Sequence, residues 1–154
     1  MNAPSTVEDD RRWLDVAVHE ARSGLAEGGI PIGAAMVCDD VLVASGRNQR
    51  VQLGSAIRHG ETDCIERAGR QPASLYRRST LYTTLSPCFM CAGTVLLYGI
   101  PRVVVGENKS YEASEELLRA HGVDVVVVDD AACLEMMNSF VQAHPDLWFE
   151  DIGR

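Results

Sequence analysis

Two short clusters of the sequence contain the residue types that bind a metal ion and move a proton. The first is His59-Gly60-Glu61, at the start of a predicted helix, and the second is Pro87-Cys88-Phe89-Met90-Cys91, where a predicted strand gives way to a helix. A catalytic zinc ion needs three thiolate or imidazole ligands and one open position for water. Cys88 and Cys91 are three residues apart on a first helical turn, so their side chains project to the same side. We expect both to bind zinc together with His59.

Glu61 lies two residues after the predicted imidazole ligand, close enough to reach a zinc-bound water without binding the metal itself. Zinc lowers the pKa of its water towards ~7, and a neighbouring carboxylate can then take the proton and pass it to a substrate. The sequence therefore predicts Glu61 as the catalytic acid and base.

Each cluster alone is ambiguous, because a Cys-x-x-Cys pair also occurs in redox motifs and in structural zinc sites. The combination is far more specific, since 25 residues separate Glu61 from Pro87 and each cluster opens a predicted helix. Zinc deaminases that act on cytosine or adenine carry this pair of motifs. The two clusters together therefore indicate a zinc deaminase.

Over nearly its full length the chain resembles the fungal-type cytosine deaminases. The stretches that carry the resemblance are GGIPIG (28–33), HGE (59–61), TLYTTLSPC (80–88), YGIPRVVVGEN (98–108), VVVVDD (125–130) and WFEDIG (148–153). The last stretch is the most discriminating, because other zinc deaminase branches end differently. The resemblance implies an α/β fold, namely a three-layer α/β/α cytidine-deaminase-like sandwich around a five-stranded mixed sheet. It also implies a homodimer with one Zn²⁺ ion per subunit, held by residues that match His59, Cys88 and Cys91, with Glu61 as the proton shuttle.

Five further residues match positions of the family's substrate pocket. Asn48 matches a residue that binds the pyrimidine edge, and Asp151 matches a carboxylate that accepts a hydrogen bond from the substrate amino group. Trp148 and Ile152 match residues of a C-terminal lid over the pocket. Tyr111 stands where the family usually has a stacking phenylalanine, and its added hydroxyl needs a partner if it is buried.

Two other positions depart from the family pattern. Phe89 stands between the two cysteines in place of an acid, and we expect it to face away from the ligands. The segment Thr62-Asp63-Cys64 is also unlike the family. Cys64 lies one helical turn from Glu61, and as a fourth zinc ligand it would close the open position. We instead expect Cys64 to be a small buried hydrophobic residue.

The predicted reaction is the hydrolytic deamination of free cytosine to uracil and ammonia, a step of pyrimidine salvage, with substituted cytosines open as further substrates. One alternative is a deaminase of another aminated ring, such as 5-methylcytosine, isoguanine, guanine or creatinine, for which Tyr111 is a reason. A tRNA adenosine deaminase is a second alternative, although its expected features are His-Ala-Glu and a basic C-terminus, whereas this tail is acidic and aromatic. The third is a non-enzymatic zinc module or a redox protein.

The elements that must position these residues alternate between helices and strands. A first helix is predicted to begin between Ser5 and Asp10 and to end at Gly28-Gly29, and a β-hairpin follows with its turn at Asp39-Asp40. Predicted strands cover 32–37, 41–44, 80–85, 102–105 and 125–128, and predicted helices cover 60–69, 88–98, 112–121 and 131–143, with 45–58 as a polar loop. Apolar strands that alternate with helices are typical of right-handed β-α-β units and of a sheet covered on both faces.

Length and composition limit the class of protein. The 154 residues, 46% of them hydrophobic, predict a single deaminase domain over 1–154. No apolar run reaches the ~20 residues of a membrane span, and residues 1–10 are polar and acidic, unlike a signal peptide. Five cysteines, an odd number, favour free thiols in the reducing cytoplasm.

The charge is unevenly distributed along the chain. The formal net charge of −8 argues against a general affinity for nucleic acid or for anionic lipid. Residues 47–78 carry seven arginines and three acids, a local net charge of +4, whereas the remainder carries −12. We expect this arginine-rich segment to be a solvated loop and helix face, with a rim that faces an anion as the alternative.

Overall fold

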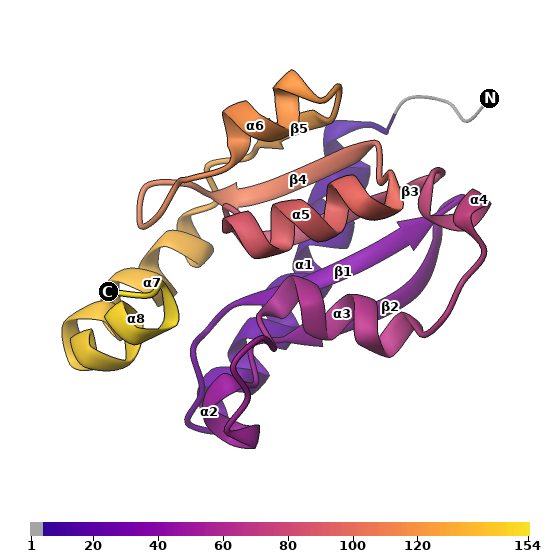
Figure 1. Cartoon of the computed structure of the whole chain (residues 1–154). Helices are drawn as coiled ribbons and strands as arrows, with labels where there is room; N and C mark the ends of the chain where they lie inside the picture. The colour runs from indigo at the N-terminus through magenta and orange to yellow at the C-terminus, as the bar shows by residue number, and fades with distance from the viewer. Residues whose placement is uncertain (1–4) are drawn as a thin grey trace.

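A five-stranded mixed sheet lies at the centre of the computed structural model, which describes residues 5–154 (Figure 1). The strand order is β2-β1-β3-β4-β5. Strand β1 is antiparallel to both β2 and β3, whereas β3, β4 and β5 run parallel to one another. The strands are β1 (Gly33–Cys38), β2 (Val41–Arg47), β3 (Ser79–Leu85), β4 (Arg102–Glu107) and β5 (Asp124–Val127). The mixed sheet expected from the sequence is confirmed.

Strands β1 and β2 form the predicted hairpin. Its turn residues Asp39 and Asp40 have φ angles of 51° and 58°, the left-handed conformation that matches a two-residue turn to the twist of its strands. The second strand continues to Arg47, beyond the predicted end at Ala44, because its last residues stay paired with the start of β1. Asn48 therefore directly follows a strand instead of lying within a loop.

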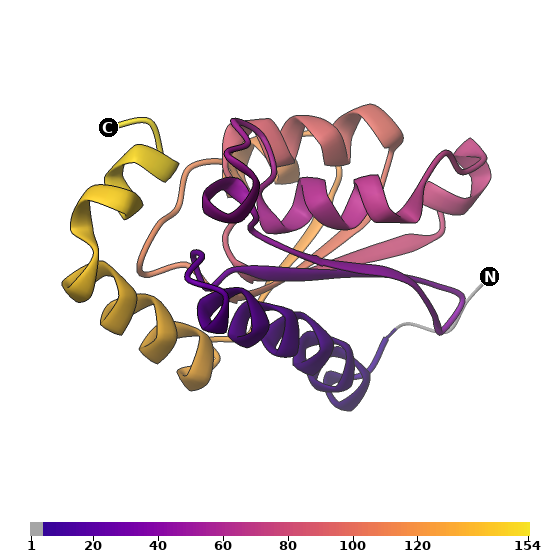
Figure 2. The same ribbon diagram turned by 90° about the horizontal axis from the view of Figure 1, so that it is seen from below.

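Helices α1 (Val7–Ala26) and α7 (Ala131–Ala143) cover one face of the sheet, and Figure 2 shows α1 running along it. The start of α1 lies within the predicted range and has a capping box, in which the side chains of Thr6 and Asp9 each accept a hydrogen bond from the other's backbone N–H. The buried cluster on this face consists of Trp13, Leu14, Ala17, Val18, Ala35, Val37, Tyr82, Val104 and Cys133.

Helices α3 (Gly60–Ala68), α5 (Phe89–Tyr98) and α6 (Glu115–Ala120) cover the opposite face, where Figure 2 shows α3 and α5 side by side. Side chains of β1 point alternately to the two faces of the sheet. Ala34 and Met36 therefore pack on this side, and Ala35 and Val37 pack on the other. Strands β2 and β3 are parallel, since each pairs antiparallel to β1. Their carboxyl ends therefore meet at one edge of the sheet, from which the chain leads into α3 and α5.

Three short helices, α2 (Arg50–Leu53), α4 (Ala73–Tyr76) and α8 (Pro145–Asp151), were not predicted. The polar loop expected over 45–58 was wrong in part, because it contains the end of β2 and all of α2. Helix α6 starts three residues later than expected, since the backbone N–H of Glu115 donates to the Glu112 side chain within a turn before the helix. Pro145 begins α8, where its missing N–H leaves no hydrogen bond unmade.

The polar and acidic N-terminal stretch, residues 1–10, was expected not to be a signal peptide. Its first four residues lie outside the described residues. Among the residues from 5 onward, none of the helices combines the length and the apolar character needed to cross a membrane.

Gly46 determines how closely β2 approaches α3. A Cβ atom at this position would lie 2.3 Å from the backbone nitrogen of Cys64, so one of the two backbones would have to move. We expect Gly46→Ala to lower the free energy of unfolding by about 1–3 kcal/mol, the usual cost of overpacking.

Gly24→Ala is the matched control, because its Cβ would meet no atom closer than 3.6 Å and alanine favours a helix interior. Urea denaturation of both variants measures the difference. Equal loss of stability in the two would contradict the close approach of β2 to α3.

Candidate active site

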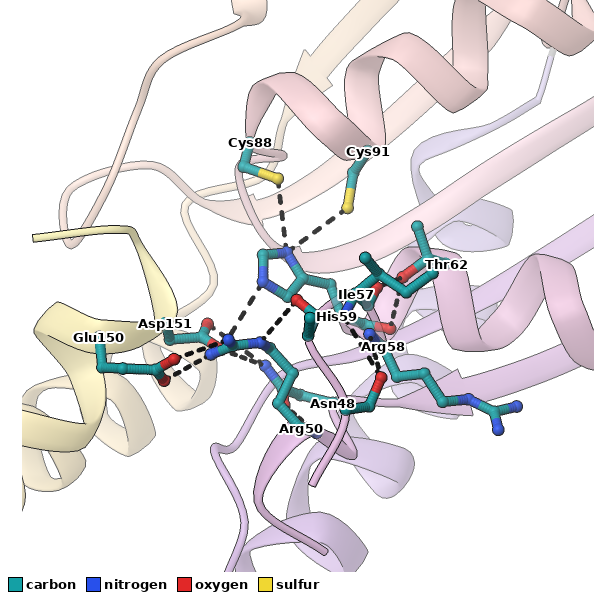
Figure 3. Close-up of polar contacts among 12 residues, drawn as sticks. Asn48, Arg50, Ile57, Arg58, His59, Thr62, Cys88, Cys91, Glu150 and Asp151 are labelled. Carbon is teal, nitrogen blue, oxygen red and sulfur yellow. Dashed lines mark hydrogen bonds and ion pairs between the residues drawn. The ribbon is translucent and has the colours of Figure 1, made fainter. Parts of the chain in front are cut away.

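Helices α3 and α5 each begin at a predicted metal ligand. His59 is the N-cap of α3 and Cys88 is the N-cap of α5. Figure 3 shows the His59 ring with the two cysteines on one side and Asp151 on the other. His59 Nδ1 lies 3.4 Å from Cys88 Sγ and 3.7 Å from Cys91 Sγ, and the three potential ligand atoms all lie within 4.8 Å of one another.

The donor set of this cluster fits a zinc ion. Two sulfurs and one imidazole nitrogen are ligands that zinc prefers, and three protein ligands leave a position open. A hydrogen bond from Cys91 outweighs the effect of burial and, together with His59, lowers the pKa of Cys88 to about 4. The site therefore favours the thiolate at Cys88, which is the form that binds metal.

The charges around His59 favour its protonated form. Burial by itself would lower the pKa of His59, but the hydrogen bond with Cys88 and the charges of Asp151 and Glu61 raise it to about 9. These groups surround the imidazole with negative charge, so the cluster attracts a cation. A bound metal ion would satisfy the same attraction, and its binding would release the imidazole proton.

Glu61 lies in the first turn of α3, buried beside this cluster. Its Oε1 lies 2.5 Å from Thr83 Oγ1, and its Oε2 accepts a hydrogen bond from Cys91 Sγ at 3.0 Å. Burial raises the pKa of Glu61, although the nearby His59 opposes this effect. A carboxyl group whose pKa is shifted towards neutral is suited to both taking up and releasing a proton.

A small pocket opens over the cluster. It encloses about 280 Å³ of space between protein atoms, the open solvent at its mouth included. Its lining residues come from the sheet edge, the two helix starts, the loop after β4 and the C-terminus, and they are Ile32, His59, Glu61, Leu85, Ser86, Cys88, Tyr111, Trp148, Asp151 and Ile152. The rings of Tyr111 and Trp148 meet edge to face, with their centroids 6.1 Å apart. The pocket thus contains four of the five predicted substrate residues.

Asn48, the fifth of these residues, lies behind Asp151 and is fully buried. Its Nδ2 lies 3.1 Å and 3.3 Å from the two carboxylate oxygens of Asp151. Its Oδ1 accepts a hydrogen bond from the backbone N–H of Arg50. The structure therefore brings Asn48 and Asp151 into contact although they lie far apart in the sequence. In this arrangement the Asn48 amide contacts the carboxylate and does not line the pocket.

Sequence reasoning did not identify Arg50 and Glu150. The Arg50 guanidinium makes two hydrogen bonds to Glu150, at 2.6 Å and 2.7 Å, and its Nη1 lies 3.2 Å from Asp151 Oδ1 (Figure 3). These bonds join the first residue of helix α2 to helix α8. Their positions in the sequence could have identified them, because each lies within two residues of a predicted site residue and the two carry opposite charges.

Most arginines of the arginine-rich segment pair with acids, some of them within the segment and others in distant parts of the chain. Arg47 pairs with Glu20 and Glu27, and Arg50 with Glu150 and Asp151. Three more of its arginines form ion pairs, which are Arg58–Asp63, Arg67–Asp63 and Arg78–Asp39. These pairs favour the solvated, internally paired face over a rim that faces an anion.

Both departures in the motif region lie as expected. Cys64 is fully buried, and its Sγ points to the Ala44 carbonyl oxygen at 3.4 Å. The described residues that could hold a metal ion together do not include it. Phe89 is largely exposed, away from the ligand atoms.

Comparison with known proteins identifies the family. Residues 7–107 match the cytidine and deoxycytidylate deaminase zinc-binding region. The chain belongs to this family. A cytosine deaminase from Candida albicans is 47% identical to this deaminase over 146 residues, which cover 94% of this chain and 97% of that protein. A tRNA-specific adenosine deaminase 2 from Xenopus tropicalis is 31% identical over 126 residues, which cover 77% of this chain and 74% of that protein.

Solved structures agree with this assignment. A tRNA:A34 deaminase has a TM-score of 0.65 at 27% identity and covers 76% of this chain and 97% of its own. A guanine deaminase from Nitrosomonas europaea has a TM-score of 0.66 at 21% identity, covering 90% of this chain and 86% of its own, a likeness of fold alone. The expected three-layer cytidine-deaminase-like fold is confirmed, and the protein is a zinc-dependent deaminase.

We expect the purified protein to hold one zinc ion per chain, and Cys91→Ser to lose most of it. A serine hydroxyl stays protonated and cannot replace a thiolate ligand. Elemental analysis of dialysed protein measures the zinc content. Cys64→Ser is the matched control because it changes a buried cysteine outside the cluster, and loss of zinc from that variant would contradict the proposed ligand set.

Proposed function

We propose that this deaminase acts on free cytosine, converting cytosine and water to uracil and ammonia in pyrimidine salvage. The single observation that carries the proposal is the small pocket closed by the C-terminal residues Trp148, Asp151 and Ile152. A pocket of this size suits a free base better than a nucleotide within a polymer. The likeness to the Candida albicans cytosine deaminase, which extends over nearly the whole chain, supports the same substrate. In this proposal residues 1–154 act as one domain.

His59, Cys88 and Cys91 are the residues we propose to hold the zinc ion. When bound, zinc supplies the charge that lowers the pKa of a water molecule to near 7 and so makes it a nucleophile at neutral pH. Nδ1 is the nitrogen of His59 that faces the two sulfurs. The other nitrogen, Nε2, lies 3.6 Å from Asp151 Oδ1, which can fix the orientation of the ring.

Glu61 carries the protons in this mechanism. It takes a proton from the attacking water and gives it to ring N3, which makes C4 electrophilic. The water oxygen bonds to C4, and Glu61 then transfers the second proton of that oxygen to the amino group. The C4–N4 bond breaks, ammonia leaves and C4 becomes the carbonyl carbon of uracil. Thr83 holds one carboxylate oxygen of Glu61 in place for both transfers.

The remaining pocket residues bind and cover the ring. Asp151 accepts a hydrogen bond from the amino group of cytosine. Asn48 contributes to recognition of the pyrimidine edge through the Asp151 carboxylate, which its amide contacts. Tyr111 and Trp148 form an aromatic wall. Ile152, at the end of α8, completes a lid that excludes water during the reaction.

The outer face of α5 supports the homodimer that we also propose. Phe89 and Leu97 are 63% and 76% exposed, and Gly93 lies between them on the same face with open space above it. Exposed apolar stripes of this kind mark contacts between proteins, and a symmetric dimer pairs the same patch of two copies. Because the same helix begins at Cys88, the subunit contact would lie close to the active site.

We propose a cytoplasmic location. All five cysteines of the chain lie within the described residues and are free, as a reducing compartment favours.

A panel of free bases tests the substrate. Ammonia release from the zinc-loaded protein should be fastest with cytosine, slower with 5-methylcytosine and absent with guanine, isoguanine and creatinine. Tyr111 is the reason to include substituted rings, because its hydroxyl changes the pocket wall. If the protein released ammonia from a purine but not from cytosine, the proposal would be overturned. Salt-sensitive binding of tRNA would instead favour an enzyme that edits tRNA, because phosphate contacts weaken steeply as the salt concentration rises.

Glu61→Gln should lose at least about 10³-fold of the turnover number, within the usual contribution of general acid–base catalysis. It should retain zinc and bind uracil, because the amide keeps the shape of the side chain but cannot carry the proton. Steady-state kinetics, zinc analysis and calorimetry with uracil provide these readouts. Substantial turnover in this variant would exclude Glu61 as the proton carrier.

Leu97→Glu should shift the protein from dimer to monomer, because it places a charge in the apolar stripe. Light scattering after size-exclusion chromatography measures the mass. Val7→Glu, at a position on α1 that is 74% exposed, is the control and should remain dimeric. A dimer that persists in Leu97→Glu at micromolar concentration would place the subunit contact elsewhere.

A further inference from the structure

Asp63 is a fully buried carboxylate in the second half of the first turn of α3, two residues after Glu61. Its oxygens accept hydrogen bonds from the backbone N–H of Arg47 and from the side chain of Gln49, each at 3.0 Å. These donors stand immediately before and after Asn48. One buried carboxylate thus fixes the chain on both sides of the residue that contacts Asp151.

Two arginines neutralise this carboxylate. Arg58 Nε lies 3.0 Å from Oδ1, and Arg67 Nε lies 3.1 Å from Oδ2. Arg58 directly precedes His59, and the backbone N–H of Asp63 donates to the His59 carbonyl oxygen at 2.9 Å. Asp63 is therefore connected to the end of β2, to the N-cap residue of α2 and to the residue that begins α3.

Asp63 does not line the pocket, so it cannot contact a bound base there. Its influence can reach the substrate through Asn48, whose amide contacts both oxygens of Asp151. Asp63 belongs to the segment that departs from the family pattern, so this support is a feature of this chain's own residues. A backbone anchored at both neighbours leaves the Asn48 side chain little freedom to turn.

We propose that Asp63 is a positioning residue that holds Asn48, and through it the Asp151 carboxylate, in the orientation that binds the substrate amino group. The inference rests on the roles proposed above for Asp151 as a substrate contact and for Asn48 as the residue that fixes it. Removing the Asp63 charge should loosen the chain between the end of β2 and the start of α2 without removing a metal ligand. The expected effect is therefore on substrate binding more than on the chemical step.

Asp63→Asn tests this role while keeping the shape of the side chain. We expect KM for cytosine to rise about 10- to 100-fold, the range that a small displacement of a binding group produces, with kcat changed much less and one zinc ion retained. Asp124→Asn is the matched control. Asp124 also pairs with an arginine, Arg102, but its side chain is 65% exposed and lies far from the pocket, so KM should stay unchanged.

A double-mutant cycle with Asn48→Ala separates positioning from general support of the fold. If Asp63 acts through Asn48, the double variant should have the KM of Asn48→Ala alone, because the effects of coupled residues do not add. Fully additive effects, or an unchanged KM in Asp63→Asn, would overturn the proposal. If Asp63→Asn does not fold, Gln49→Ala removes only the loop-side donor and should raise KM in the same direction, whereas an unchanged KM there would also overturn it.

This outcome is distinguishable from a failure of the proposed function. If the wild-type protein proves inactive on cytosine, the substrate proposal fails, and the same cycle is then measured on whichever base the wild-type enzyme deaminates.

Discussion

His59 and Cys88 each stand at the start of a helix. The packing of these two helices over one end of the sheet brings one imidazole and two thiols close enough together to bind a single metal ion. Parallel strands β2 and β3 end at the same edge, so both helices start there. The approach is tight, since Cβ atoms at Gly46 and Gly60 would press on neighbouring backbone. Every other part of the site is arranged around this meeting of helix starts.

The C-terminal helix closes the site through polar contacts. Asn48 and Arg50, just after β2, bind Asp151 and Glu150 of α8 (Figure 3). Charge-assisted hydrogen bonds are the stronger kind, and those that Asn48 and Arg50 make to Asp151 fix a carboxylate beside His59 Nε2. Part of the uneven charge of the sequence is paired in the fold, because Arg47, Arg50 and Arg78 contact acids outside the segment 47–78.

Much of this could be predicted from the sequence. The spacing of the motif residues predicted the metal ligands and the catalytic acid, because local helix geometry decides which way those side chains point. The alternation of apolar strands with helices predicted the layers of the fold. Contacts between distant segments could not be read in the same way. Nothing local indicates that Arg50 reaches Glu150, that Asp63 accepts bonds from both sides of Asn48, or that the tail is helical. Backbone pairing with β1 likewise carried β2 through the polar residues to Arg47.

X-ray absorption spectroscopy at the zinc edge of the purified protein tests most directly whether this cluster is a catalytic centre with an open position. We predict two sulfur ligands at about 2.3 Å and two nitrogen or oxygen ligands at about 2.0–2.1 Å, namely one imidazole and one solvent oxygen. A third sulfur, or a fourth protein ligand in place of the solvent, would describe a closed structural site and would contradict the deaminase mechanism.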